Sequence, residues 1–354
     1  MQNPLIPKWT GPYGGVPPFD QVKVEYFKPA LESAMAECLA EMDRIAGDSA
    51  PPTFANTIEA MEKGGRMLDR VGSIYGVYSS TLRNAAFQEV EREMEPKLAG
   101  FRDKVVQNEK LFKRIAAVYD ARERSGLDSE QKRLTWLKYQ DFARSGARLD
   151  AGAKKKLSDI NQRLATLYTE FSQNVLADEN TALFLDKEAD LAGLPQSLRD
   201  AAGEAAKERG QPGKWAILNT RSSVEPFLTY SERRDLRRNV WEAFVSRGDN
   251  GNERDNKKII AEIVKLRGER AQLLGYKSHA HWRLEMSMAK TPERATQLME
   301  AVWKPAVKRV AEEVSDMQAV ADKEGAGIRI EPWDYRYYAE KVRKAKYDVD
   351  DNEV

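Results

Sequence analysis

Histidine is the residue type whose spacing first suggests chemistry in this chain. The sequence holds 2 histidines among 354 residues, and both lie in the segment Ser-His-Ala-His-Trp, as His279 and His281. Imidazoles this close together suggest a metal site. Residues two apart in a helix point about 200° apart, however, and cannot chelate one ion together. Gly275 and a capping Ser278 predict a helix start here, so we interpret the histidines as polar residues of that helix rather than as ligands.

The other short catalytic patterns are missing from the sequence. It contains no H-E-x-x-H, no G-x-S-x-G, no G-x-x-x-x-G-K-[ST] and no G-x-G-x-x-G. Cys38 is the only cysteine, so it forms no internal disulfide and no thiolate zinc site. Acidic pairs are plentiful and none stands out as a general acid and base. We therefore predict neither catalytic residues nor metal ligands in this chain.

An aromatic cluster near the end of the sequence is the best candidate for contact with a ligand. Its members are Trp333, Tyr335, Tyr337 and Tyr338. Tyrosines that project from a helix can line a peptide groove and donate hydrogen bonds. Tyr337 and Tyr338 are accordingly our substrate-groove candidates. The alternative is that the cluster packs its helix onto the body of the protein, which is the commoner role of aromatic residues on helices.

The composition excludes several classes of partner. Charged residues make up 32% and hydrophobic residues 41%, and the net charge is +1. This balance is typical of globular proteins and gives no reason to expect nucleic acid or an anionic membrane as partner. No run approaches the ~18 apolar residues of a membrane-spanning helix. The Pro- and Gly-rich start lacks the features of a signal peptide. We expect a cytoplasmic protein.

The elements that must position these residues are mainly helices. Apolar residues at three- and four-residue steps predict helices over 27–45, 58–78, 154–177, 256–274 and 292–323. Gly64 and Gly65 fall inside the second of these, where a closely packed neighbour would tolerate them. Residues 246–256 read as a turn. The helix over 292–323 is expected to bury one apolar side: Leu298, Val302, Trp303, Ala306, Val310, Val314, Met317 and Ala321.

Two short segments rich in β-formers interrupt the helices. Residues 181–185 and 214–220 predict two strands, which bracket a short helix over 195–209. The predicted fold class is mainly α, with a small antiparallel β element around 181–220. The predicted regions are an irregular lead-in (1–26), a helical region (27–178), a β-containing insertion (179–230) and a second helical region (231–354).

Several stretches, taken in order, resemble one family. They include GGVPPFDQVKVEYFKPALESAM, PPTFANTIEAME, FSQNVLADE, PFLTYSERRDLRRNVWEAFVSRG, LLGYKSHAHW, MAKTPE and PWDYRYYAEKVRKAKYD. Together they resemble the thimet oligopeptidase family of zinc metallopeptidases over essentially the whole chain. Within that family, the NPL lead-in and the FSQNVLADE and AGLP segments are most similar to the bacterial peptidyl-dipeptidases.

The resemblance implies a two-lobed, neurolysin-like helical fold with a peptide channel between the lobes. It also implies zinc held by an H-E-x-x-H helix and a downstream glutamate, with the Glu of the motif as general base. Peptidyl-dipeptidases of this kind release dipeptides from the C-terminus of short peptides. None of these catalytic residues is present here. The resemblance thus implies an N-terminal half that packs against a missing catalytic half, binds no zinc itself and is inactive alone.

Two other interpretations remain open at this point. The chain could be a non-catalytic helical module that binds peptides or a partner. Alternatively, a separate polypeptide could supply the catalytic half. The reading frame after Val354 and co-purification of an H-E-x-x-H protein distinguish these possibilities from a fragment of a longer enzyme.

Overall fold

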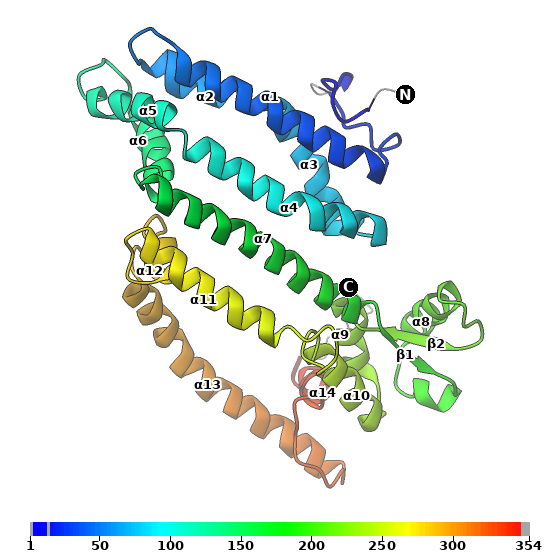
Figure 1. Cartoon of the computed structure of the whole chain (residues 1–354). Helices are drawn as coiled ribbons and strands as arrows, with labels where there is room; N and C mark the ends of the chain where they lie inside the picture. Colours follow the sequence, from blue (N-terminus) through cyan, green and yellow to red (C-terminus); the bar gives the residue numbers. More distant parts are fainter. Residues whose placement is uncertain (1–2, 13–14, 348–354) are drawn as a thin grey trace. The chain divides into compact units, whose positions relative to one another are not determined.

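The computed structural model describes residues 3–12 and 15–347 and confirms the mainly α prediction (Figure 1). Every helix in the described part of the chain is too short or too polar to span a bilayer. The elements are α1 (Phe27–Gly47), α2 (Ala60–Lys63), α3 (Arg66–Thr81), α4 (Ala85–Val106), α5 (Glu109–Ala121), α6 (Ser129–Arg144), α7 (Ala151–Glu179), β1 (Ala182–Leu185), α8 (Gln196–Glu208), β2 (Trp215–Leu218), α9 (Arg221–Tyr230), α10 (Arg234–Val245), α11 (Lys257–Leu273), α12 (His279–Leu284), α13 (Pro292–Lys323) and α14 (Tyr335–Tyr347).

The chain divides into two compact units. Unit 1 comprises residues 1–170 and 261–283, and unit 2 comprises residues 171–260 and 284–354. The regions 1–26, 27–178, 179–230 and 231–354 remain a prediction about domains. Residues 1–2 and 13–14 of the first region and 348–354 of the last lie outside the described residues.

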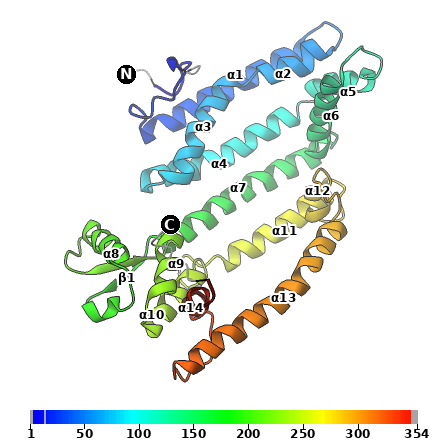
Figure 2. The ribbon, with the colours of Figure 1, turned by 180° about the vertical axis from the view of Figure 1, so that it is seen from behind.

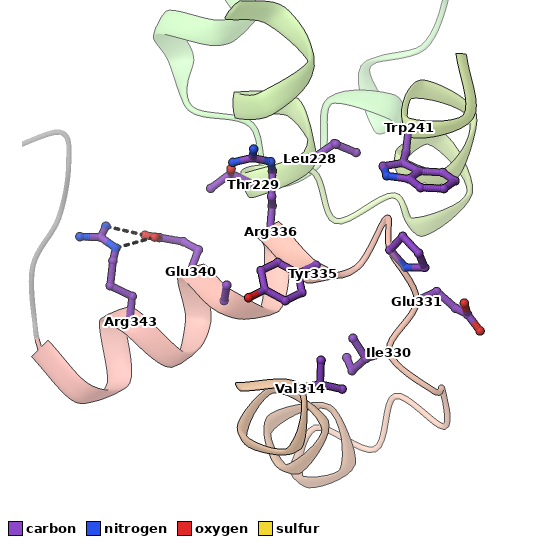
Figure 3. A pocket seen from close by; sticks show the side chains of 12 residues that line it. Leu228, Thr229, Trp241, Val314, Ile330, Glu331, Tyr335, Arg336, Glu340 and Arg343 are labelled. Carbon is purple, nitrogen blue, oxygen red and sulfur yellow. Dashed lines mark hydrogen bonds and ion pairs between the residues drawn. The ribbon is translucent and has the colours of Figure 1, made fainter. Parts of the chain in front are cut away.

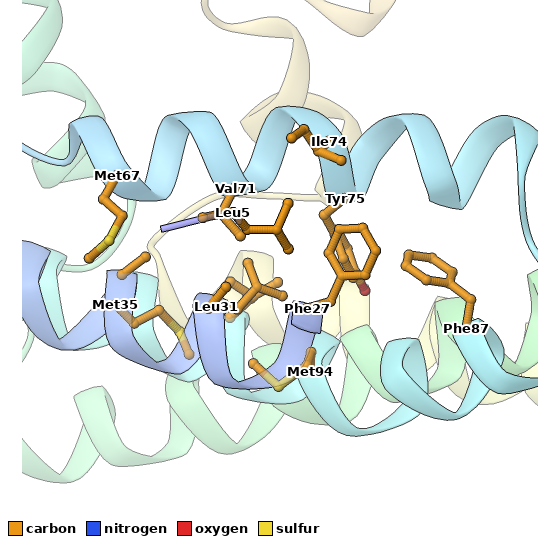
Figure 4. Packing of buried hydrophobic residues seen from close by; sticks show 13 residues of the cluster. Leu5, Phe27, Leu31, Met35, Met67, Val71, Ile74, Tyr75, Phe87 and Met94 are labelled. Carbon is orange, nitrogen blue, oxygen red and sulfur yellow. The ribbon is translucent and has the colours of Figure 1, made fainter. Parts of the chain in front are cut away.

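The main core of unit 1 forms where α1, α3 and α4 meet the lead-in (Figure 4). Phe27 lies edge-on to Phe87, with ring centroids 5.2 Å apart. Leu5 of the lead-in is fully buried in the same cluster. The side chain of Asn3 donates a hydrogen bond of 2.8 Å to the carbonyl of Tyr26, the residue directly before α1. The irregular start of the chain therefore contributes to the core.

A second cluster of unit 1 joins the C-terminal part of α1 to α5 and α6. From residue 261 onward, α11 continues unit 1 and lies along α7. Arg163 of α7 forms a two-bond ion pair with Glu262 at 2.7 and 2.8 Å. Arg267 donates to the hydroxyl of Tyr168 at 2.8 Å. These contacts hold the two helices together along one side of a cavity described below.

The helix predicted over 58–78 is broken at its paired glycines. α2 ends at Lys63 and α3 begins at Arg66, and Gly65 between them has φ +71°. Glycine adopts this left-handed conformation without strain. The close packing expected there is real, because a Cβ at Gly64 would lie 3.0 Å from Cε of Met42 on α1. The prediction of one continuous helix was wrong, since glycine conformation outweighed the apolar periodicity.

Unit 2 contains the small sheet that the sequence predicts. β1 pairs antiparallel with β2, in a register that places Ala182 opposite Leu218 and Leu185 opposite Trp215. The predicted intervening helix is present as α8, which packs against β2. α9 and α10 complete the apolar cluster around Phe227.

The predicted turn over 246–256 is anchored to the end of α7 by a buried carboxylate. Asp178 accepts hydrogen bonds of 2.8 Å from the backbone N–H of Gly248 and from the side chain of Asn250. The side-chain amide of Asn174 on α7 also donates a hydrogen bond of 2.9 Å to the side-chain oxygen of Asn256. The carboxylate thus fixes the path of the chain between α10 and α11.

α13 buries only the last part of its predicted apolar side. Met317 and Ala321 are buried against α14, whereas Trp303 is 70% exposed and Leu298 is 69% exposed. The prediction of burial was therefore wrong for the first two thirds of this helix, within the described residues. We call this exposed set the α13 stripe: Leu298, Met299, Val302, Trp303, Val307 and Val310.

Candidate functional site

The two histidines lie on α12 and make separate contacts. Ser278 caps the helix, and its hydroxyl accepts from the backbone N–H of His281 at 3.4 Å and lies 2.8 Å from Nδ1 of the same residue. The His279 ring instead packs against Trp282, with centroids 5.6 Å apart. The predicted helix start at Ser278 is thus confirmed.

The surroundings of His279 are apolar and positive. Burial, together with Arg267, Arg270 and Arg283, lowers the pKa of His279 to about 4. A neutral imidazole is a possible metal ligand, but no group of three or more His, Cys, Asp or Glu side chains among the described residues is placed to hold an ion. These residues do not fit the zinc site that the family resemblance implies, so we derive no zinc chemistry from them.

Tyr337 and Tyr338 lie on the inner face of α14. Tyr338 is 4% exposed and belongs to the cluster formed with Met317 and Ala321. The rings of Tyr337 and Tyr338 meet edge-on, with their centroids 5.2 Å apart. The guanidinium carbon of Arg237 lies 4.2 Å from the centroid of the Tyr337 ring. Both side chains pack α14 onto its neighbours. Their role as groove residues is untested by these contacts, and the packing favours the alternative given for the cluster, in which it holds its helix on the body of the protein.

A cavity of about 790 Å³ lies on another face of α14, in unit 2 (Figure 3). Its apolar wall includes Leu228 of α9, Trp241 of α10 and Val314 of α13. Its other residues are Thr229, Ile330, Glu331, Pro332, Tyr335, Arg336, Ala339, Glu340 and Arg343. This volume lies in the range of sites that take small organic ligands.

The polar groups of this cavity come mainly from α14. Glu340 and Arg343 form an ion pair at 2.7 and 2.9 Å, drawn in Figure 3. The Tyr335 hydroxyl donates to Glu313 at 2.6 Å, and this hydrogen bond raises the pKa of Tyr335. A site with an apolar wall, carboxylates and guanidinium groups suits a peptide, which offers apolar side chains, amides and charged ends.

A buried ion-pair network holds α14 in place beside this cavity. Asp334 is fully buried and accepts 2.8 Å hydrogen bonds from both Arg237 and Arg234 of α10. Arg237 also donates to the backbone carbonyls of Ser231 and Trp333, at 2.7 and 3.2 Å. The start of α14 is thus fixed against α9 and α10, which sets the position of Tyr335 and Arg336.

Sequence reasoning identified one residue of the cavity and missed the others. Tyr335 belongs to the predicted aromatic cluster, whereas the sequence predicts no ligand contact for Trp241, Arg336 or Glu340. A helical signal was present, because Tyr335, Ala339 and Arg343 follow one another at four-residue steps. The partners from α9, α10 and α13 carry no such signal, since they come from distant parts of the chain.

Comparison with known proteins finds a family match for the C-terminal part of the chain. Residues 227–354 match the sequence profile of Peptidase family M3. This stretch includes α10, α14 and all the residues given above as lining the cavity beside α14. This part of the sequence is therefore similar to the M3 peptidases.

Individual relatives extend the similarity to nearly the whole chain. Dipeptidyl carboxypeptidase from Escherichia coli (strain K12) is 35% identical over 353 residues, which is 99% of this chain and 52% of that protein. The dipeptidyl carboxypeptidase of Salmonella typhimurium is 33% identical over 353 residues, which is again 99% of this chain and 52% of that protein. Oligopeptidase A from Escherichia coli is 28% identical over 359 residues, which is 52% of its length. These matches confirm the predicted family resemblance. The chain spans about half the length of the curated relatives it matches.

Proposed function

We propose that this chain is the N-terminal half of a zinc-dependent oligopeptidase of the peptidyl-dipeptidase type. The complete enzyme would hydrolyse short peptides and release C-terminal dipeptides. The observation that carries the proposal is the coverage, since 99% of this chain matches 52% of a dipeptidyl carboxypeptidase. The sequence contains no H-E-x-x-H. We therefore assign zinc binding and peptide-bond cleavage to a region outside these 354 residues and expect this chain alone to be inactive.

The contribution of this chain would be to bind the peptide and to support the catalytic half. The cavity beside α14 supplies an apolar wall and paired charges for a peptide. The α13 stripe supports the packing proposal, because contiguous exposed apolar residues are typical of a surface that meets another polypeptide. A cytoplasmic location remains a prediction of the same proposal.

The cavity also favours a second candidate, a non-catalytic module that binds peptides or a partner. The reading frame after Val354 separates the two. Continuation of the frame into an H-E-x-x-H segment would establish the longer enzyme. A stop codon directly after Val354, with a purified chain that behaves as a monomer, would favour the module instead. Co-purification of a separate H-E-x-x-H protein would assign the catalytic half to another polypeptide.

A further inference from the structure

A second cavity, of about 410 Å³, lies within unit 1 among residues of α4, α7, α11 and α12. Figure 2 shows the ribbon of these helices. Leu157, Leu164 and Leu274 contribute apolar wall, and Trp282 and Tyr168 contribute aromatic surface. Three of its polar residues, Asp103, Asn161 and Arg270, come from three different helices. The volume is that of a site for a small organic molecule.

One carboxylate oxygen of this cavity has no hydrogen-bond partner within the described residues. Asp103 is 7% exposed, and its Oδ1 accepts a 2.8 Å hydrogen bond from Asn161. Its Oδ2 is buried and unpartnered. Burial raises the pKa of Asp103, although Asn161, Ser158 and Arg270 act in the opposite direction. A buried acceptor of this kind is costly unless a donor meets it.

A guanidinium of the same cavity is incompletely satisfied as well. Arg270 donates from Nη1 to the side-chain oxygen of Asn161 at 3.1 Å, while its Nε is buried without a partner among the described residues. The guanidinium carbon of Arg270 lies 4.7 Å from the centroid of the Trp282 ring. The indole N–H of Trp282 donates a hydrogen bond of 3.1 Å to the backbone carbonyl of Arg144. Burial, together with Arg267 and Arg283, lowers the pKa of Arg270. An anion near Arg270 would offset this accumulation of positive charge.

The side chain of Asn161 bridges the two charged groups, because its amide nitrogen bonds Asp103 and its oxygen bonds Arg270. Asp103 and Arg270, which both line the cavity, thus each carry a buried polar atom without a partner among the described residues, on either side of one amide. A plain anion would satisfy only Arg270, and a plain amine would satisfy only Asp103. A molecule with both an ammonium and a carboxylate would satisfy both and place an apolar substituent on the leucine wall.

We propose that this cavity binds a small zwitterion, with the ammonium on Asp103, the carboxylate on Arg270 and an apolar side chain against Leu157 and Leu164. Free amino acids and dipeptides both have this chemistry. The site lies within unit 1 and does not depend on the peptidase proposal.

Calorimetric titration of the 354-residue chain with L-leucine and with L-alanyl-L-leucine tests the site and distinguishes its two sources. Saturable binding of at least one of the two compounds is expected. The compound that binds more tightly shows whether the site takes a free amino acid or a dipeptide. N-acetyl-leucine lacks the ammonium and leucinamide lacks the carboxylate. Each should bind at least about tenfold more weakly, as expected for the loss of one charged hydrogen bond. Absence of binding by both zwitterions, or equal binding of the blocked compounds, would overturn the proposal.

Substitutions locate the binding within this cavity. Asp103→Asn and Arg270→Gln should each weaken binding at least about tenfold, whereas Arg66→Gln, an exposed position of unit 1 outside the cavity, should leave it unchanged. Ala165→Leu fills cavity space without removing a polar group. This variant therefore tests the position of the site even if a charge substitution prevents folding. Unaltered binding by the folded Ala165→Leu variant would contradict the proposed position.

Discussion

Arg237 and Asp334, 97 residues apart in the chain, form a hydrogen-bonded ion pair at 2.8 Å in which both side chains are buried. Arg237 is 2% exposed and Asp334 is fully buried. The pair joins α10 to the start of α14, and so it connects the fold of unit 2 to the cavity that Tyr335 and Arg336 line.

Removing one member of this pair should strongly destabilise unit 2. Asp334→Ala leaves a buried guanidinium uncompensated, and we expect the free energy of unfolding to fall by about 3–5 kcal/mol. Urea unfolding at neutral pH measures this. The double variant Arg237→Ala/Asp334→Ala should lose less than the sum of the single losses, because neither charge is left alone.

Lys207→Ala is the matched control for this experiment. Lys207 pairs with Glu204 on the same unit, but both side chains are more than half exposed. Exposed pairs contribute little to stability. An Asp334→Ala variant as stable as Lys207→Ala would show that the buried network is not what holds α14 in place.

The α13 stripe should tolerate polar substitution in the isolated chain. Trp303 is 70% exposed, so Trp303→Ser should change the free energy of unfolding by no more than about 0.5 kcal/mol. Met317, on the same helix, is 1% exposed, and Met317→Ala should cost about 2–5 kcal/mol. Chemical denaturation of the two variants side by side makes the comparison. Similar losses would mean that the stripe is already covered in the isolated chain.

Peptide binding in the cavity beside α14 should depend on the side chain of Trp241 and not on the hydroxyls of Tyr337 and Tyr338. Trp241→Ala removes part of its apolar wall and should weaken the binding of short peptides by about tenfold or more. Tyr337→Phe/Tyr338→Phe removes only two hydroxyls from side chains that pack α14, so peptide affinity should be unchanged. Equilibrium titration with a fluorescent peptide measures both. Loss of affinity in the double Phe variant would instead assign these tyrosines to the groove.

His279 should make the fold less stable in mild acid. Its pKa is about 4 in the folded chain, below the ordinary value of 6.5, so between these values the unfolded state binds more protons than the folded state. The contribution of His279 to stability is therefore complete above about pH 6.5 and is lost as the pH falls toward 4.

Urea unfolding at several pH values between 7 and 4 tests the direction of this pH dependence of stability. His279→Gln should reduce the loss of stability across that range, whereas His281→Gln should retain it, because His279 is still present. If the His279→Gln variant lost stability with falling pH as steeply as the unsubstituted chain, the burial of His279 would not be the cause.

Sequence patterns predicted the elements that depend on local periodicity. The long helix over 154–177 is present as α7, Ala151–Glu179, and the two strands are present in the expected segments. Periodicity identifies an apolar face but not what covers it, which is why Trp303 was expected to be buried. The break at Gly65 was missed because its left-handed conformation, rather than its helix propensity, decides the path of the chain.

The sites were harder to predict because they are assembled from distant segments. Asp103, Asn161 and Arg270 meet only after three helices pack. No spacing in the sequence signals that two of their atoms have no hydrogen-bond partner in the described part of the chain. On α14, the sequence drew attention to the aromatic residues of the packed face. The cavity lies on the adjoining face, with Tyr335, Ala339 and Arg343.

The most direct test of the central proposal is to assay the purified 354-residue chain for bound zinc and for release of dipeptides from a short peptide, alone and joined to a catalytic half that carries an H-E-x-x-H. The chain alone should hold no stoichiometric zinc and release no dipeptide. The joined protein should do both, and a chelator should abolish the release. Stoichiometric zinc together with chelator-sensitive dipeptide release from the chain alone would contradict the account.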